Sequence, residues 1–75
     1  MTLSDAKEGD VVKVVKLKSS SAIKQRMLDM GIMPSSEIRV ERYAPLRDPI
    51  QIKVKGYNLA LRVSEGNQIE VEPVS

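Results

Sequence analysis

The sequence contains no cysteine and no histidine, and its only aromatic residues are Tyr43 and Tyr57. Without cysteine the chain forms neither disulfide bonds nor thiolate metal sites, which fits a reducing compartment. Without histidine it lacks the usual general base near neutral pH and a common zinc ligand. We therefore expect a protein that is not an enzyme, and we assign it no catalytic residue and no cofactor.

Long apolar runs are also absent. No stretch approaches the roughly 18 apolar residues that a membrane-spanning helix requires. Residues 1–10 lack the basic segment and the apolar run of a secretory signal peptide. We expect a cytoplasmic protein without direct membrane insertion.

A strong excess of charge of one sign is missing as well. Twelve Lys and Arg residues stand against ten Asp and Glu residues, which gives a net charge of only +2. The two signs are interspersed, whereas binding through phosphates usually needs a clustered basic face, often with stacking aromatic residues. We expect no nucleic-acid partner. Carboxylates alone can hold ferrous iron, but the sequence singles out no metal ligand.

The residues that are present predict a mainly β fold. Apolar residues alternate with polar ones, imperfectly in the first segment, so we expect strands near residues 11–18, 36–41, 49–55, 58–63 and 69–74. The imperfect alternation of the first segment indicates either a bulge or burial of both faces near one end. The spacing of Ile23, Met27 and Met30 predicts one short helix over residues 22–30, which Gly31 ends. We expect one domain over residues 1–75, folded as a small, partly open barrel of about five strands with one short α-helix.

Two turns connect the predicted strands from residue 49 onward. Gly56 and Tyr57 fit a two-residue hairpin turn of type II′, with the glycine first. This placement exposes the side chain of Tyr57. The second connection, residues 64–68, is expected to form a turn or one helical turn.

The segment APLRDPI, residues 44–50, predicts a stiff loop, because Pro45 and Pro49 each fix one backbone torsion and restrict the preceding residue. Such order lowers the conformational entropy that binding costs. We interpret Leu46 as an apolar anchor for a protein partner, with Arg47 and Asp48 as polar contacts beside it. Two other roles stay open: Leu46 packing back onto the barrel, and Asp48 capping backbone N–H groups of the loop.

Three further residues complete the predicted partner-binding set. Tyr57 is a candidate because of its expected exposure in the turn. Arg26 and Arg62 either present their charge to a partner or pair with Asp29, Asp48 or Glu65 at the surface.

Residues 25–71, QRMLDMGIMPSSEIRVERYAPLRDPIQIKVKGYNLALRVSEGNQIEV, resemble the FeoA family, ferrous iron transport protein A. The residues that carry the resemblance are Arg26, Gly31, Pro34, Pro45, Asp48, Pro49, Gly56, Tyr57, Leu59 and Arg62. The sequence departs from the family pattern in two places: Met27 and Met30 replace the usual leucines, and Ser35 stands where glycine is common. The first change conserves core volume, and the second affects only the turn after Pro34.

The resemblance implies an SH3-like barrel in the cytoplasm of a prokaryote. It also implies an accessory or regulatory role beside the membrane transporter FeoB, whose cytoplasmic part binds and hydrolyses GTP. Related domains occur at the C-terminus of iron-dependent repressors, which connects the family with metal binding.

Our leading interpretation is a non-enzymatic regulator of ferrous iron uptake that docks on the GTP-binding part of a FeoB-type transporter. The alternative is a nucleic-acid-binding or metal-sensing domain related to the repressors, although the chain has no room for a helix-turn-helix. A third interpretation is an autonomous metal carrier. The sequence leaves open the oligomeric state and the direction of the regulatory effect.

Overall fold

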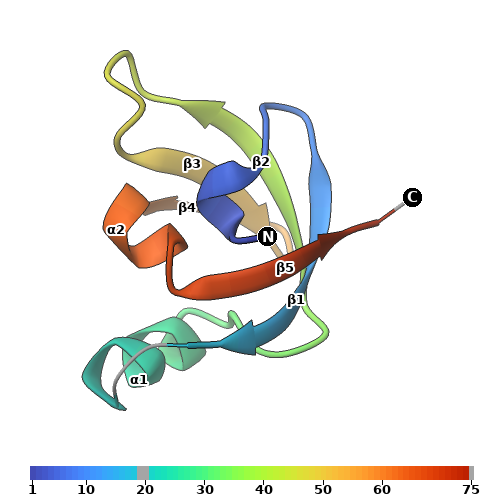
Figure 1. The fold of residues 1–75 in the computed structure, drawn as a ribbon, viewed down its shortest axis with the longest axis vertical. Helices are drawn as coiled ribbons and strands as arrows, with labels where there is room; N and C mark the ends of the chain where they lie inside the picture. The colour runs from blue at the N-terminus through green and yellow to red at the C-terminus, as the bar shows by residue number, and fades with distance from the viewer. Residues whose placement is uncertain (19–20, 75) are drawn as a thin grey trace.

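The structure, a computed structural model, describes residues 1–18 and 21–74, without the side chains of residues 21–23. In chain order its elements are the 3-10 helix η1 (Leu3–Asp5), β1 (Val11–Leu17), α1 (Ser21–Asp29), β2 (Glu37–Tyr43), β3 (Ile50–Val54), β4 (Tyr57–Leu61), α2 (Val63–Gly66) and β5 (Ile69–Pro73) (Figure 1). The fold is mainly β, as the sequence predicted.

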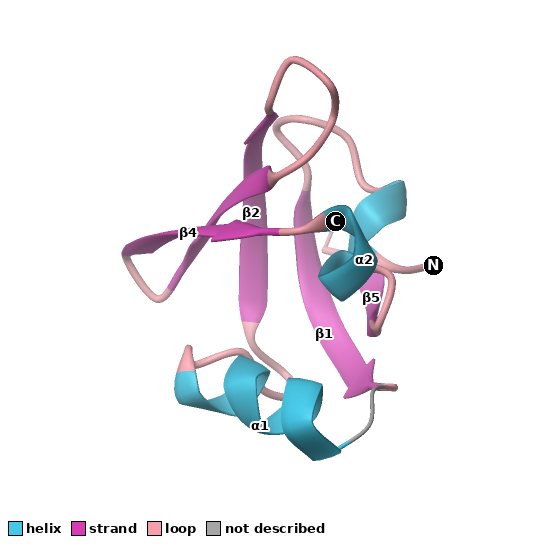
Figure 2. Cartoon of the chain, turned by 90° about the vertical axis from the view of Figure 1, so that its left-hand side faces the viewer, coloured by secondary structure: helices cyan, strands magenta, loops and turns pink. Residues whose placement is uncertain are grey.

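The five strands form one antiparallel sheet in the order β4-β3-β2-β1-β5. The sheet curls around the core, and in the described residues its edge strands β4 and β5 do not pair with each other. The prediction of a small, partly open five-stranded barrel is therefore confirmed. The helix α1 lies at one end of the barrel, and the loop between β2 and β3 projects from the other end (Figures 1 and 2).

The core consists of side chains that point inward from alternate strand positions. In β2 and β3, the buried residues are Ile38, Val40, Ile50, Ile52 and Val54, each at most 1% exposed. These residues match the period of two in the sequence, because successive side chains of a strand point to opposite faces. The hydrophobic effect on this face holds the sheet in its register.

The bulge predicted for the first strand is present in β1. Its register with β5 shifts between Val14 and Lys16. Val12 and Val14 are buried, whereas Val15 is 46% exposed. An extra residue in one strand accounts for the imperfect alternation in the sequence.

The predicted helix is confirmed within one residue at each end. Met27 is completely buried, and Met30 packs partly against the core. Ile23, the third residue of the predicted apolar face, lies outside the described side chains. Gly31 has φ +87°, the left-handed conformation expected just after a helix.

The hairpin turn differs from the prediction by one residue. Lys55 and Gly56 are its central residues, with φ +52° and +83°. Two positive φ values define a type I′ turn rather than type II′. Tyr57 is therefore the first residue of β4, where it pairs with Val54.

Two features of the fold, the end of β4 and the N-terminal segment, were not predicted correctly. The strand expected over residues 58–63 ends at Leu61, because Val63 begins α2. The sequence also gave no role to the N-terminal segment, yet Leu3 and Ala6 are buried in the core. The carbonyl of Met1 accepts a hydrogen bond from the Val71 N–H at 2.8 Å. The N-terminal segment therefore covers the free edge of β5.

Candidate partner-binding surface

The loop between β2 and β3 presents one hydrophobic side chain to solvent. Leu46, at its tip, is 91% exposed. The other exposed large hydrophobic residues of the described chain are no more than 71% exposed. The possibility that Leu46 packs back onto the barrel is therefore wrong.

Local contacts give this loop a defined shape. The Ala44 N–H donates to the carbonyl of Pro49 at 3.0 Å, and the Arg47 N–H donates to the carbonyl of Ala44 at 2.7 Å. Arg47 has φ +64°, which closes the tip of the loop. Its guanidinium lies 4.5 Å from the centroid of the Tyr43 ring, within the range of a cation–π contact.

Tyr43 fixes the start of the loop to the N-terminal segment. Its hydroxyl donates to the carbonyls of Ser4, at 3.2 Å, and Ala6. Its backbone N–H donates to Glu8 Oε2 at 3.1 Å. Burial raises the pKa of Tyr43 above the usual value for tyrosine, so the hydroxyl remains a donor at neutral pH. Tyr43 was not among the residues predicted from the sequence.

Asp48 fixes the end of the loop to α2. Its Oδ1 accepts the Val63 N–H at 3.0 Å and lies 4.0 Å from Arg62 Nε. Next to this pair, Glu65 Oε1 accepts the Arg62 N–H at 3.0 Å, and Glu65 Oε2 pairs with Arg26. Asp48 thus accepts a backbone N–H of α2 rather than one within the loop, and the two arginines form the surface pairs that the sequence analysis left open.

Glu65 holds α1 and α2 together, and sequence reasoning missed it. It is only 7% exposed, and its carboxylate is satisfied by charge-assisted and backbone hydrogen bonds. The signal in the sequence was its spacing: a glutamate three residues after the residue that precedes a helix can accept the backbone N–H of that residue, which is one half of a capping box. Arg62 and Glu65 have that spacing, but no pattern in the sequence predicted that a helix of only four residues begins at Val63.

Five of the six predicted residues are connected by the loop and by ion pairs. Leu46, Arg47 and Asp48 belong to the loop, Arg62 lies beside Asp48, and Arg26 on α1 pairs with Glu65 of α2. Tyr57 is 71% exposed but lies at the opposite end of β3 from this loop. The structure therefore does not bring Tyr57 and Leu46 together in one contact patch.

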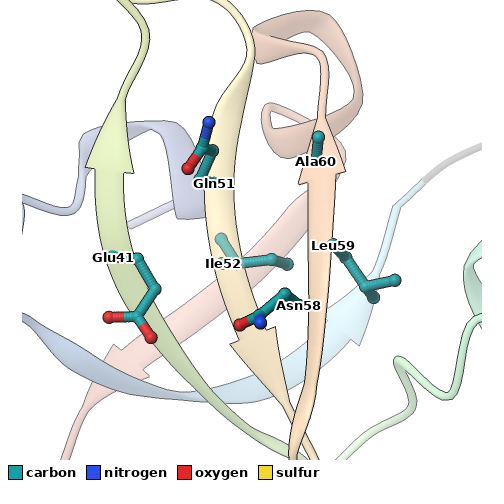
Figure 3. Close-up of a pocket in the computed structure, with 6 residues that line it drawn as sticks. All are labelled: Glu41, Gln51, Ile52, Asn58, Leu59 and Ala60. Atoms are coloured by element: carbon teal, nitrogen blue, oxygen red, sulfur yellow. The ribbon is translucent and has the colours of Figure 1, made fainter.

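A hollow of about 230 Å³ lies beside the strands β2, β3 and β4. Its lining residues are Glu41, Gln51, Ile52, Asn58, Leu59 and Ala60 (Figure 3). Glu41 lies 3.6 Å from Arg39 Nε, and Gln51 accepts a hydrogen bond from Arg42 at 2.8 Å. Two of its three polar side chains are thus engaged with neighbouring arginines, the third is Asn58, and the hollow has no arrangement of nucleophile and base.

The described residues place no three His, Cys, Asp or Glu side chains together where these would hold a metal ion. None of their helices is long and apolar enough to cross a lipid bilayer.

Known proteins are similar to this chain in sequence and in fold. The FeoA domain family matches residues 1–73. A protein of Porphyromonas gingivalis described as an Fe(2+) transport protein A/Fe(2+) transporter FeoB fusion protein is 36% identical over all 75 residues, which span 9% of its length.

Two solved structures extend the comparison. An FeoA-like protein from Clostridium acetobutylicum is 36% identical, with a TM-score of 0.93 over 100% of this chain and 87% of that chain. Stenotrophomonas maltophilia FeoA, solved with zinc and described as a procaryotic SH3 domain protein, is 26% identical, with a TM-score of 0.84 over 96% of this chain and 89% of that chain. The SH3-like fold is thereby confirmed, and the chain belongs to the FeoA family.

Proposed function

We propose that this protein is a non-enzymatic accessory subunit of ferrous iron uptake. In this proposal it acts in the cytoplasm as one domain over residues 1–75 and docks on the GTP-binding part of a FeoB-type transporter. Membership of the FeoA family supports the assignment to iron transport. The Porphyromonas gingivalis relative supports the choice of partner, because its name joins both proteins in one chain.

The observation that carries the docking proposal is the exposed Leu46 on a loop whose shape is held by contacts within the chain. An apolar side chain on a preorganised loop gains binding free energy while losing little conformational entropy. Arg47 and Asp48 flank Leu46 in the loop, Arg62 lies beside Asp48, and Arg26 on α1 is linked to Arg62 through Glu65. Tyr57 contributes only if the partner also reaches the far end of β3.

The direct test measures the affinity of the purified full-length transporter for variants of this protein. We expect Leu46→Ala to weaken binding by more than about 1 kcal/mol, because it removes the apolar anchor. Val15→Ala is the matched control, since Val15 is 46% exposed on β1, outside the loop, and its truncation should leave binding unchanged. Equal binding of Leu46→Ala and wild type, with the fold intact, would contradict the proposal.

Tyr57→Ala is tested separately because of its position. Weakened binding would mean that the transporter covers both ends of β3, whereas unchanged binding would restrict the contact to the loop. Salt adds a further distinction: apolar docking should depend weakly on ionic strength, while binding to phosphates falls steeply as salt rises.

A further inference from the structure

The two edges of the sheet differ in how they are protected. The edge of β5 is covered, because the Met1 carbonyl accepts the Val71 N–H at 2.8 Å and Thr2 forms a bridge with Glu70. The other edge strand, β4, pairs only with β3 in the described residues. Its sequence YNLAL carries no charge and no proline, and its register with β3 has no bulge. Charges, prolines, bulges and covering segments usually keep an edge strand from pairing with another chain, so β4 lacks the protection that β5 has.

The register of the hairpin identifies the backbone groups of β4 that face the open edge. Val54 and Tyr57 flank the two-residue turn and form a hydrogen-bonded pair. In an antiparallel ladder, hydrogen-bonded pairs alternate with pairs that exchange no hydrogen bonds. The N–H and C=O groups of Asn58 and Ala60 therefore point away from β3. In the described part of the chain, no turn, loop or cap hydrogen bond engages these two donors and two acceptors.

The hollow lined by Asn58 and Ala60 lies next to this edge. Both side chains are exposed, and the hollow extends from them over β3 toward Glu41 of β2 (Figure 3). The side chain of Ala60 is a single methyl group, so it blocks little of the path from the edge of β4 to the hollow. When a peptide adds to an edge strand, backbone hydrogen bonds supply affinity and pockets for alternate side chains supply specificity. The edge and the hollow together meet both requirements.

The two ends of β4 connect its edge with the proposed docking surface. At one end, Leu61 is followed by Arg62, whose Nε lies 4.0 Å from Asp48 Oδ1 of the loop. At the other end, Tyr57 is the first residue of the strand and is 71% exposed. A strand of this length, five residues, extends over roughly 17 Å. One extended segment that follows β4 thus passes from the loop to Tyr57 and contacts both ends of β3.

We propose that an extended segment of the transporter adds as a strand to the open edge of β4, with its backbone bonded to Asn58 and Ala60. This inference rests on the proposed docking function and names the way in which the partner is bound. It adds Asn58 and Ala60 to the binding surface. Continuity with the loop selects the transporter over a second copy of this chain, and pairing with a second copy is an outcome of the test.

The first test removes one backbone donor. Ala60→Pro deletes the N–H that faces the open edge, a position where edge strands tolerate proline. It should weaken binding to the purified full-length transporter about tenfold, because one hydrogen bond is lost and the ring stands where the added strand approaches. Ala60→Ser is the matched control, since it keeps the N–H and a small side chain, and its affinity should stay within about twofold of wild type.

Thermal unfolding of both variants verifies that the fold is retained. Wild-type affinity of folded Ala60→Pro would overturn the proposal. Equal losses for Ala60→Pro and Ala60→Ser would also overturn it, because the side chain rather than the backbone donor would then be responsible.

Hydrogen exchange provides a second readout that needs no substitution. In the protein alone, the amides of Asn58 and Ala60 should exchange faster than those of Leu59 and Leu61, which bond to β3. In the complex with the full-length transporter, exchange at Asn58 and Ala60 should slow about tenfold or more. Leu59 and Leu61 serve as internal references within the same strand. Unchanged exchange at Asn58 and Ala60 in the complex would overturn the proposal.

The result for Leu46→Ala separates this inference from the proposed function. If Leu46→Ala weakens binding and Ala60→Pro does not, the docking function stands and the added strand is wrong. If Leu46→Ala has no effect, the docking function itself fails, whatever the result for Ala60→Pro. Sedimentation of the protein alone tests the second copy: self-association that Ala60→Pro abolishes, without a loss of transporter binding, would assign the edge to a second copy and overturn the proposal.

Discussion

The loop and the turn at the two ends of β3 achieve order in different ways. Each is associated with an exposed hydrophobic residue: Leu46 lies within the loop, and Tyr57 directly follows the turn. The loop is tied by Tyr43 and Asp48 to segments far away in the sequence. The turn is closed by its own backbone, with positive φ at both central residues. The shape of the loop therefore depends on the completed fold, whereas the shape of the turn depends on two residues.

The largest effect that separates these regions should come from Tyr43→Phe. This change removes the hydroxyl and leaves the carbonyls of Ser4 and Ala6 without their donor. We expect a loss of about 1–3 kcal/mol in the free energy of unfolding, measured by urea denaturation. Tyr57→Phe is the control, because the exposed Tyr57 makes no such bonds in the described residues, and it should change stability by less than about 0.5 kcal/mol. Equal effects of the two substitutions would contradict the inference that the loop, unlike the turn, depends on contacts with distant segments.

The same tyrosine should produce a dependence of stability on alkaline pH. Burial raises the pKa of Tyr43, so the unfolded chain releases this proton at a lower pH than the folded protein. Its contribution to stability is complete below the unfolded pKa near 10 and is lost as the pH rises through the folded pKa. Denaturation series above pH 9 should show a smaller decline for Tyr43→Phe than for wild type. A decline of the same size in both proteins would exclude Tyr43 as its source.

A smaller effect should follow from Asp48→Ala at the other end of the loop. The Val63 N–H loses its acceptor, and Arg62 loses a nearby carboxylate. We expect stability to fall by about 1 kcal/mol. Docking on the transporter should also weaken although Leu46 is unchanged, because the loop is no longer held in its binding shape. If stability falls while affinity stays at the wild-type value, order in the loop does not contribute to docking.

The smallest effect should come from the turn and have the opposite sign. Lys55 has φ +52°, a conformation that costs energy for most residues but suits asparagine, and Asn-Gly is a preferred pair in type I′ turns. Lys55→Asn should therefore stabilise the protein by about 0.5 kcal/mol and leave docking unchanged. A destabilised Lys55→Asn variant in thermal unfolding would show that the lysine side chain has a further role.

The sequence predicted most of the barrel because its strands carry their own pattern. A period of two in the sequence predicts which face of β2 and β3 is buried, and the structure buries Ile38, Val40 and the three inward residues of β3. Tertiary contacts account for the parts that were missed. The N-terminal segment has no regular period, so its buried Leu3 and Ala6 become visible only when the sheet is assembled. Lys55 is an uncommon residue for positive φ, and for this reason the predicted turn was one position too far along the chain.

The candidate site was predicted less completely for the same reason. The prolines of the loop indicate stiffness, and Leu46 at its tip is exposed, as a role in partner binding requires. No local pattern shows that Tyr43 reaches the N-terminal segment or that Glu65 pairs with Arg26, since these partners lie far apart in the chain. Ser35, where the family commonly has glycine, has φ +77°, so this departure alters the residue while the left-handed backbone is kept.

The position of β5 in the sheet has a consequence for the order of folding during synthesis. This strand is the last in the sequence, yet it pairs with β1, the first, and carries the N-terminal segment on its outer edge. While the ribosome still covers residues 69–73, β1 has only one of its two neighbours and Leu3 has no complete site. Contacts between distant segments form late and slow the folding of small β domains. The nascent chain should therefore remain incompletely folded until β5 has left the exit tunnel.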